Sequence, residues 1–461
     1  MLNLIQHLTK SGTYETLKRV QGDGLGLFTR PSFSIYKILI GGGVMQRIIH
    51  LSLFVCFLFL GSAALVPAAE PILLGVPTSL KLIEGAEGNK AVILATEEIN
   101  AKGGVKVGKE KRLLKVESLD IRDGEPGVPV PEALLGIEKL ILDKKIYAVV
   151  LGNFRSEALL AAMDIYSKYK TININSTAMA PTFQQKILGG PEKYKYSFRN
   201  CLDARYLVGY ISGLMKEINK DFGYTKVFII TQDVLWATAT GSLMEKWFKE
   251  NGWTVVGFEK YPTGASDFSS GLMKARSGGA QVILPVFDMP TSGILVKQWK
   301  GMKVSAMMGG FISPLAGSKA WETFEGEIEG AMNVIFEIGQ VPVKAYSPST
   351  KFYEAYKKRW KEELQSGHAV SPSYDSVYIL ANAIERAGTL DVDKVVKAIE
   401  ETDMAGAVGK IRFDKGHQLI FGSDPINAAL SAAVQWKKGK RIIVYPESIS
   451  DEKIEKPSWM K

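Results

Sequence analysis

The sequence predicts an α/β fold in which two similar lobes each contain a parallel sheet covered by helices. Short apolar segments typical of strands alternate with amphipathic segments that have helical spacing. This alternation occurs twice, over roughly residues 72–195 and 198–335. Strands separated by helices form βαβ units, so we expect the strands to lie parallel and the helices to cover both faces of each sheet.

The expected elements follow one another along the chain. The first repeat and its end predict strands at 72–76, 112–120, 148–151, 171–175 and 196–199, with helices at 85–102, 131–143 and from 156 onward. The second repeat predicts strands at 226–231, 254–258, 281–286 and 304–308, with helices at 202–217, 242–250, 268–276 and 292–300. Helices dominate from 348 to 401, and closing strands are expected at 428–436 and 441–444.

The rest of the chain is organised around the segment from Ala148 to Phe183, which has the pattern strand, turn, helix, strand and loop. Ser156 stands where the helix N-cap is expected, and Glu157 follows in the first turn. The unpaired N–H groups and positive partial charge of a helix start suit a carboxylate. Ser156 is therefore a candidate ligand residue; the alternative is that it only caps its own helix.

Ligands of open parallel sheets bind beyond the carboxyl ends of the strands. The loops that follow the expected strands are therefore the candidate site. They are Pro77–Gly85, Gly152–Ser156, Asn175–Pro181, Gln232–Trp236, Phe287–Pro290 and Gly309–Pro314.

Composition and motifs argue against several functional classes. The net charge of +9 comes from interleaved basic and acidic residues rather than a basic stripe, so we expect no nucleic-acid partner. The two cysteines and four scattered histidines form no metal-ligand pattern. The sequence lacks GxxxxGK[ST], HExxH and GxSxG, and no GxGxxG follows an expected strand. We therefore expect a binding protein, not an enzyme, without metal or cofactor.

The region 45–68 has the pattern of a secretory signal peptide. Arg47 precedes an apolar core from about Ile48 to Leu60, and small residues then permit cleavage after Ala68. The core is short for a membrane span, so an uncleaved anchor is the less favoured alternative. Because a signal peptide normally begins near the start codon, we interpret residues 1–44 as an extension from a mis-assigned start, with the true start at Met45.

Four segments in the expected order resemble one protein family. They are GNKAVILATEEINAKGGV (88–105), YPTGASDFSSGLMKAR (261–276), SYDSVYILANAIERAG (373–388) and VGKIRFDKGH (408–417). The chain is similar over nearly all of residues 70–440 to the type I periplasmic solute-binding proteins of branched-chain amino acid ABC importers.

This resemblance implies two Rossmann-like lobes joined by a three-crossing hinge. The first lobe would comprise 70–197 and 336–418, and the second 198–335 and 419–461. Hinge closure would enclose a small ligand that carries a carboxylate, and the closed form would meet an ABC permease in the inner membrane. We expect a periplasmic monomer.

The resemblance also assigns ligand contacts in the first lobe. Ser156 occupies the position of the family serine that binds the ligand carboxylate, and the adjacent Arg155 offers a second group for an anion. Thr177 stands where the family uses a backbone carbonyl for the ligand ammonium. Met179 replaces the threonine that the family uses beside it.

In the second lobe, Trp236 matches the family's aromatic contact, and Asp288 or Phe287 matches the next one. Phe311 stands where members that bind aliphatic amino acids have a glutamate for the ammonium. Replacing threonine and glutamate by Met179 and Phe311 removes two acceptors, and an ammonium buried without an acceptor is unstable. The ligand is then an aromatic or branched organic acid, unless Asp288 replaces the missing acceptor and restores an amino acid.

Three further alternatives stay open. A binder of amides or urea would differ only in its ligand. A ligand-sensing subunit would use the same fold with a membrane-crossing segment and a signalling domain. A secreted enzyme would need a site acid or base with a shifted pKa.

Overall fold

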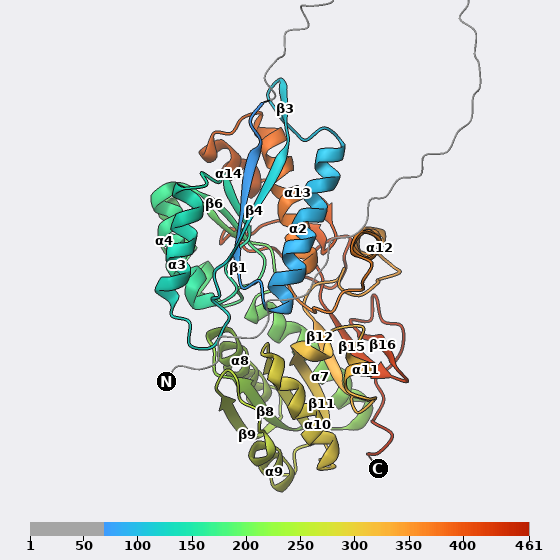
Figure 1. Cartoon of the computed structure of the whole chain (residues 1–461). Helices are drawn as coiled ribbons and strands as arrows, with labels where there is room; N and C mark the ends of the chain where they lie inside the picture. Colours follow the sequence, from blue (N-terminus) through green and yellow to red (C-terminus); the bar gives the residue numbers. More distant parts are fainter. Residues whose placement is uncertain (1–68, 461) are drawn as a thin grey trace, which may run out of the picture. The chain divides into compact units, whose positions relative to one another are not determined.

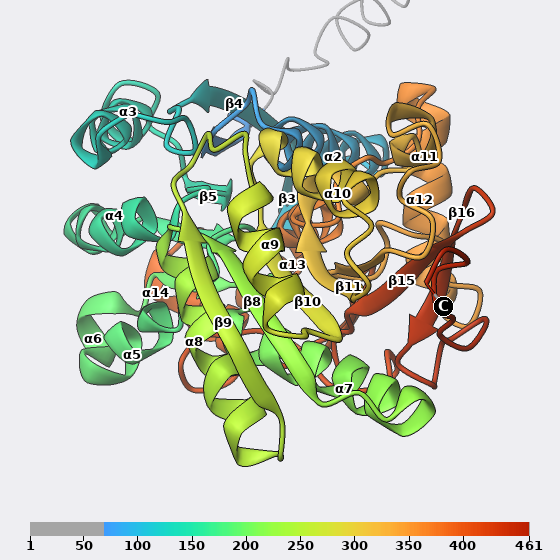
Figure 2. The same cartoon turned by 90° about the horizontal axis from the view of Figure 1, so that it is seen from below.

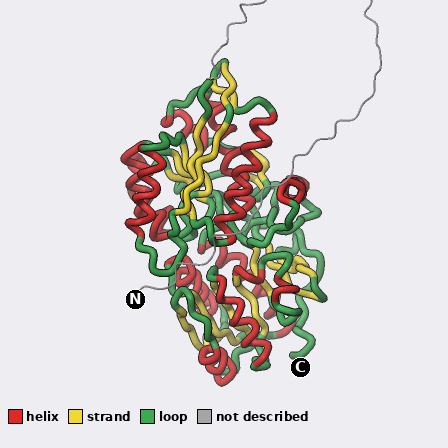
Figure 3. Tube along the Cα trace, viewed as in Figure 1, coloured by secondary structure: helices red, strands yellow, loops and turns green. Residues whose placement is uncertain are grey.

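The computed structural model describes residues 69–460. The predicted upstream extension (1–44) and signal peptide (45–68) lie outside these residues. Helices flank the strands of two main sheets (Figures 1 and 3). In the described part of the chain, no helix is both long enough and apolar enough to span a bilayer.

The first sheet contains five parallel strands in the order β4-β1-β5-β6-β7. These are β1 (Ile72–Thr78), β4 (Leu114–Asp120), β5 (Ala148–Leu151), β6 (Ile172–Asn175) and β7 (Ser197–Arg199). One face packs on α2 (Ile83–Ala101) and α13 (Val370–Ala387), and the other on α3 (Val130–Leu142) and α4 (Ser156–Tyr169) (Figure 1). Both faces are therefore covered, as predicted for a parallel sheet.

The second sheet has the order β16-β15-β12-β11-β10-β8-β9. Its parallel part consists of β8 (Lys226–Gln232), β9 (Thr254–Tyr261), β10 (Val282–Phe287), β11 (Met307–Ile312) and β12 (Met332–Ile335). The closing strands β15 (Ala432–Lys437) and β16 (Lys440–Tyr445) pair antiparallel. Helices α7 (Ala204–Phe222) and α8 (Leu235–Glu250) lie on one face, and α9 (Ser269–Ser277) and α10 (Gly293–Gly301) on the other (Figure 2).

The remaining elements are small hairpins, short helices and the longer helix α12, which packs against α2. They are β2 (Val105–Val107), β3 (Glu110–Arg112), α5 (Thr182–Gly189), α6 (Pro191–Tyr194), η1 (Pro290–Ser292), η2 (Ser313–Leu315), α11 (Ala320–Thr323), α12 (Ser347–Trp360), α14 (Val392–Glu400), β13 (Met404–Gly406) and β14 (Gly409–Ile411). The prediction of a single strand at 112–120 was wrong about where the strand begins. A β2-β3 hairpin ends at Arg112, and β4 begins at Leu114.

The strand expected at 304–308 was also placed too early, because β11 continues to Ile312. Gly309 and Gly310 indicated a strand end in the sequence, but both are inside the buried strand. A side chain at Gly310 would lie 2.1 Å from the Pro285 carbonyl oxygen of β10. Glycine at this position therefore allows the close approach of the neighbouring strand.

Three connecting segments join the two sheets, after β7, after β12 and before β15. They are hydrogen-bonded to one another, since Leu202 N–H donates to Glu337 Oε1 at 2.9 Å and Ile338 N–H donates to the Leu430 carbonyl at 2.9 Å. The chain thus has the predicted three crossings, which lie side by side.

We predict that Gly310→Ala destabilises the protein, because its methyl group has no room against Pro285. The free energy of unfolding in urea should fall by about 1–3 kcal/mol. Gly209→Ala is the matched control. Gly209 is an exposed residue of α7 with no atom near its added Cβ, so the change should be neutral or stabilising by up to about 1 kcal/mol. Equal stability of both variants would contradict the packing argument.

Candidate functional site

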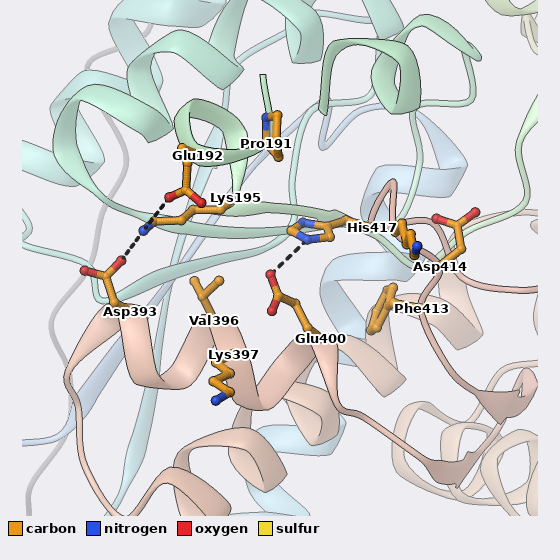
Figure 4. A pocket seen from close by; sticks show the side chains of 11 residues that line it. Pro191, Glu192, Lys195, Asp393, Val396, Lys397, Glu400, Phe413, Asp414 and His417 are labelled. Carbon is orange, nitrogen blue, oxygen red and sulfur yellow. Dashed lines mark hydrogen bonds and ion pairs between the residues drawn. The ribbon is translucent and has the colours of Figure 1, made fainter. Parts of the chain in front are cut away.

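A large hollow of about 540 Å³ lies on the surface between α6 and α14 (Figure 4). Several of its charged groups pair with one another. Lys195 Nζ lies 3.1 Å from Asp393 and 3.5 Å from Glu192, and His417 Nε2 lies 3.2 Å from Glu400. No residue from the second sheet lines this hollow, so it does not join the strand ends of the two lobes.

A second, enclosed cavity of about 10 Å³ lies where the strand ends of both sheets meet. Its size corresponds to roughly one water molecule. It is lined by Glu84, Phe154, Thr177, Met179, Trp236, Asp288, Phe311, Phe336 and His368. Because both sheets contribute side chains, this cavity is the candidate ligand site.

The turn after β5 is fixed by its neighbours. Leu151 and Gly152 have positive φ angles of 67° and 72°, which reverse the chain at the strand end. The Asn153 carbonyl accepts hydrogen bonds from Asn175 Nδ2 at 2.8 Å and from the Thr177 hydroxyl. A buried non-glycine residue in this conformation is strained and is typical of functional sites. The turn brings Phe154 to the cavity and places Arg155 beside the cavity residue Asp288.

Asp123 supports this turn from the loop after β4. Its carboxylate accepts the backbone N–H groups of Phe154 at 2.8 Å and Arg155 at 3.1 Å, and the Ser79 hydroxyl at 2.8 Å. Burial raises the pKa of Asp123 to about 6, although these hydrogen bonds and the Arg155 charge oppose the shift. Asp123 is therefore a positioning residue for Arg155.

Arg155 and Asp288 form a buried ion pair between the two sheets. Arg155 Nη1 lies 2.6 Å from Asp288 Oδ2, and its Nη2 donates to the Gly124 carbonyl at 3.3 Å. Trp236 Nε1 donates to the same Asp288 oxygen at 2.8 Å. Burial lowers the pKa of Arg155, but Asp288 outweighs that effect and raises it. The arginine expected to bind an anion thus contacts a carboxylate of the opposite lobe.

Aromatic side chains form one wall of the cavity. The Phe311 and Phe336 rings are 4.0 Å apart, and Trp236 packs edge-on against them at 6.1 and 6.0 Å. Met179 and Phe154 complete the apolar part. This wall suits an apolar or aromatic portion of a ligand.

His368 enters the cavity from the segment before α13. Its Nε2 lies 2.7 Å from the Thr177 carbonyl, and its Nδ1 lies 3.2 Å from both Glu337 carboxylate oxygens. Burial lowers the pKa of His368, but the charge and hydrogen bonds of Glu337 outweigh it and raise the pKa. The carbonyl at Thr177, which the resemblance assigned to the ligand ammonium, therefore already accepts a bond from His368.

The expectation that Ser156 caps its helix was wrong. Arg155 is the N-cap residue, and Ser156 is the first residue inside α4. The Ser156 hydroxyl instead accepts the N–H groups of Met179 at 3.2 Å and Ala180 at 3.1 Å, because the loop after β6 folds over the helix start. Ser156 does not line the cavity.

Five other residues that the sequence assigned to the ligand site lie at the cavity. Thr177, Met179, Trp236, Asp288 and Phe311 all line it. Phe287 instead points into the core of the second sheet.

Sequence reasoning missed Glu84, Phe154, Phe336 and His368. Glu84 and Phe154 lie in or beside the candidate loops and could have been found there. The other two come from connecting segments, for which no pattern pointed to the site.

Comparisons with known proteins agree with this architecture. A family model described as periplasmic binding protein matches residues 78–440. A curated relative, Leu/Ile/Val-binding protein homolog 7 of Brucella suis, is 26% identical over 417 residues, covering 88% of this chain and 98% of the relative.

Two solved structures share the fold. The branched-chain amino acid transporter substrate-binding protein LivJ from Streptococcus pneumoniae, in complex with isoleucine, has a TM-score of 0.66 at 21% identity and covers 82% of this chain and 100% of its own. An ABC transporter solute-binding protein from R. palustris, in complex with benzoate, has a TM-score of 0.64 at 15% identity and covers 83% of this chain and 99% of its own.

We predict that Asp123→Asn removes a pH dependence of stability. With its folded pKa raised to about 6, Asp123 binds a proton more tightly in the folded than in the unfolded chain, so its contribution is lost as pH rises toward 6. Between about pH 4 and pH 7, the free energy of unfolding of wild type should fall by up to about 3 kcal/mol relative to that of the variant.

Asp164→Asn is the control for this measurement. Burial raises the pKa of Asp164, but Lys193 and Lys186 outweigh it and hold the pKa at about 2. In the folded state Asp164 therefore titrates below the measured window, and in the unfolded state near its acid edge at about pH 4. The wild-type slope above about pH 5 should persist in this variant. Parallel stability curves for wild type and Asp123→Asn would contradict the assignment.

Proposed function

The chain belongs to the periplasmic binding protein family, and we propose that it is the substrate-binding component of an ABC importer that closes two lobes on a small ligand. We place the lobes at 70–197 with 336–418 and at 198–335 with 419–461. We further propose export to the periplasm with signal-peptide cleavage near Ala68, a monomeric form, an ABC permease as partner, and no enzymatic role.

The buried pair of Arg155 and Asp288 carries this proposal. The two residues come from different sheets and are 9% and 8% exposed, so separating the lobes would return both charges to water. Desolvating a buried ion pair costs about as much as its attraction returns. The free energies of the open and closed forms would then be similar, and a bound ligand could shift the equilibrium toward the closed form.

Arg155 is the proposed contact for the ligand carboxylate. In an open form it would no longer bond Asp288, and its guanidinium could bind a carboxylate at two points. The Ser156 hydroxyl accepts two backbone N–H groups and retains its own proton to donate. Thr177, Met179, Trp236, Asp288 and Phe311 would then surround the remainder of the ligand.

The aromatic wall supports a second candidate ligand class. Trp236, Phe311 and Phe336 would accept an aromatic or branched organic acid, and the R. palustris protein that shares the fold was solved with benzoate. Amides and urea are further alternatives, as is a ligand-sensing role.

A thermal-shift panel tests the proposed function. It contains aliphatic amino acids, aromatic amino acids, their deaminated acids, and amides including urea. A ligand that binds only the folded state raises the melting temperature. The proposal expects at least one class to do so, with a micromolar or lower Kd by calorimetry. If none of these classes shifts the melting temperature, the proposal fails.

We predict that Trp236→Ala weakens the tightest ligand of the panel. Loss of the indole removes apolar contact area and leaves Asp288 without its Nε1 donor. The Kd should rise roughly 30- to 1,000-fold, or about 2–4 kcal/mol. Trp247→Ala is the matched control. Trp247 lies on the same helix, packs against Phe248 and does not line the cavity. The Kd of the Trp247→Ala variant for the same ligand should therefore change less than about threefold. Equal effects would exclude the cavity as the binding site.

A further inference from the structure

The charges around the cavity are not balanced by the protein itself. Arg155 pairs with Asp288, and His368 pairs with Glu337. Glu84 also lines the cavity, but among residues 69–460 no lysine, arginine or histidine forms an ion pair with it. One acidic side chain of the site therefore lacks a counter-charge from the described chain.

Glu84 is deeply buried where both lobes meet. It is 1% exposed, and its hydrogen-bond partner is the Ser313 hydroxyl, which follows β11 of the second sheet. Its place in the first turn of α2 favours an acidic residue, because of the positive partial charge there. That preference does not require the carboxyl to be buried against the opposite lobe, where an unpaired charge is costly.

Asp288 supplies an independent sign of a missing partner. Its Oδ2 bonds Arg155 and Trp236, but its Oδ1 is buried and accepts no hydrogen bond from the described residues. Buried carboxylate oxygens are normally satisfied, so an unpartnered one that lines a cavity indicates a donor from outside the chain. Glu84 and Asp288 approach the same cavity from opposite lobes.

We propose that Glu84 and Asp288 together bind a cationic amino group of the ligand. This inference rests on the proposed ligand-binding function and narrows the ligand class to amine-bearing compounds, with an amino acid as the simplest case. The ammonium would donate to Asp288 Oδ1 and to Glu84. The two carboxylates would thus supply, at a new position, acceptors in place of those that Met179 and Phe311 remove.

Binding of an amino group beside Glu84 should depend on pH. Burial raises the pKa of Glu84, and the charge of Asp288 adds to this, whereas Ser313, its own backbone N–H and His368 oppose it. A ligand ammonium beside Glu84 would favour its ionised form and lower this pKa again. Affinity should therefore weaken as pH falls through the raised pKa of Glu84.

Matched ligand pairs provide the first test. Leucine is compared with 4-methylpentanoate, and phenylalanine with 3-phenylpropanoate, by calorimetry at pH 7.5. The inference expects the amine-bearing member of at least one pair to bind ten times more tightly or better. Equal or tighter binding of the deaminated acids overturns it while leaving the proposed function intact. If neither leucine nor phenylalanine binds, the inference is also overturned. The proposed function fails only if the deaminated acids and the amides do not bind either.

Variants provide the second test, with the amine-bearing ligand that binds most tightly. Glu84→Gln should weaken binding at least tenfold and remove the loss of affinity at low pH, which is measured by calorimetry over a pH series. Glu87→Gln is the matched control. Glu87 is a buried glutamate of the same helix that bonds the backbone of Gln365 and Ser366 and lies outside the cavity lining. Unchanged affinity and unchanged pH dependence of binding in folded Glu84→Gln, checked by circular dichroism, would overturn the inference.

Discussion

The ion pair between Arg155 and Asp288 is the interaction on which the rest of the site depends. A buried charge without a partner destabilises a protein by several kcal/mol, so each residue needs the other while the lobes are closed. Because desolvation offsets most of the attraction, the pair contributes little net stability to closure. A contact with these properties would define the proposed closed arrangement of the lobes without locking them together.

Placing Arg155 requires several local features to agree. The positive φ angles of Leu151 and Gly152 turn the chain at the end of β5, and Asp123 accepts the N–H groups that follow. The Ser156 hydroxyl joins the helix start to the loop after β6. Strain in one turn is thus offset by hydrogen bonds from two neighbouring strand ends, and the guanidinium is directed toward the opposite lobe.

Much of this arrangement could be predicted because it follows from strand order. Trp236 and Asp288 were found as residues that follow buried strands, and Thr177 and Met179 as residues of a small loop. Phe311 was found too, although it lies in β11 rather than in the loop expected there. His368 and Phe336 could not be found this way, since they come from connecting segments whose position depends on the hinge. Ser156 was misjudged because a serine at a helix start can bond a neighbouring loop instead of its own helix.

The proposed closure of the lobes on a ligand would occur about the crossing segments. Its most direct test is a distance measurement by double electron–electron resonance between spin labels at Leu135→Cys on α3 and Met273→Cys on α9, both exposed positions. If the lobes close, the distance distribution is broad or longer without ligand and becomes shorter and narrow when ligand binds. A distribution that does not change on saturation with ligand would contradict closure and leave the two lobes as a rigid unit.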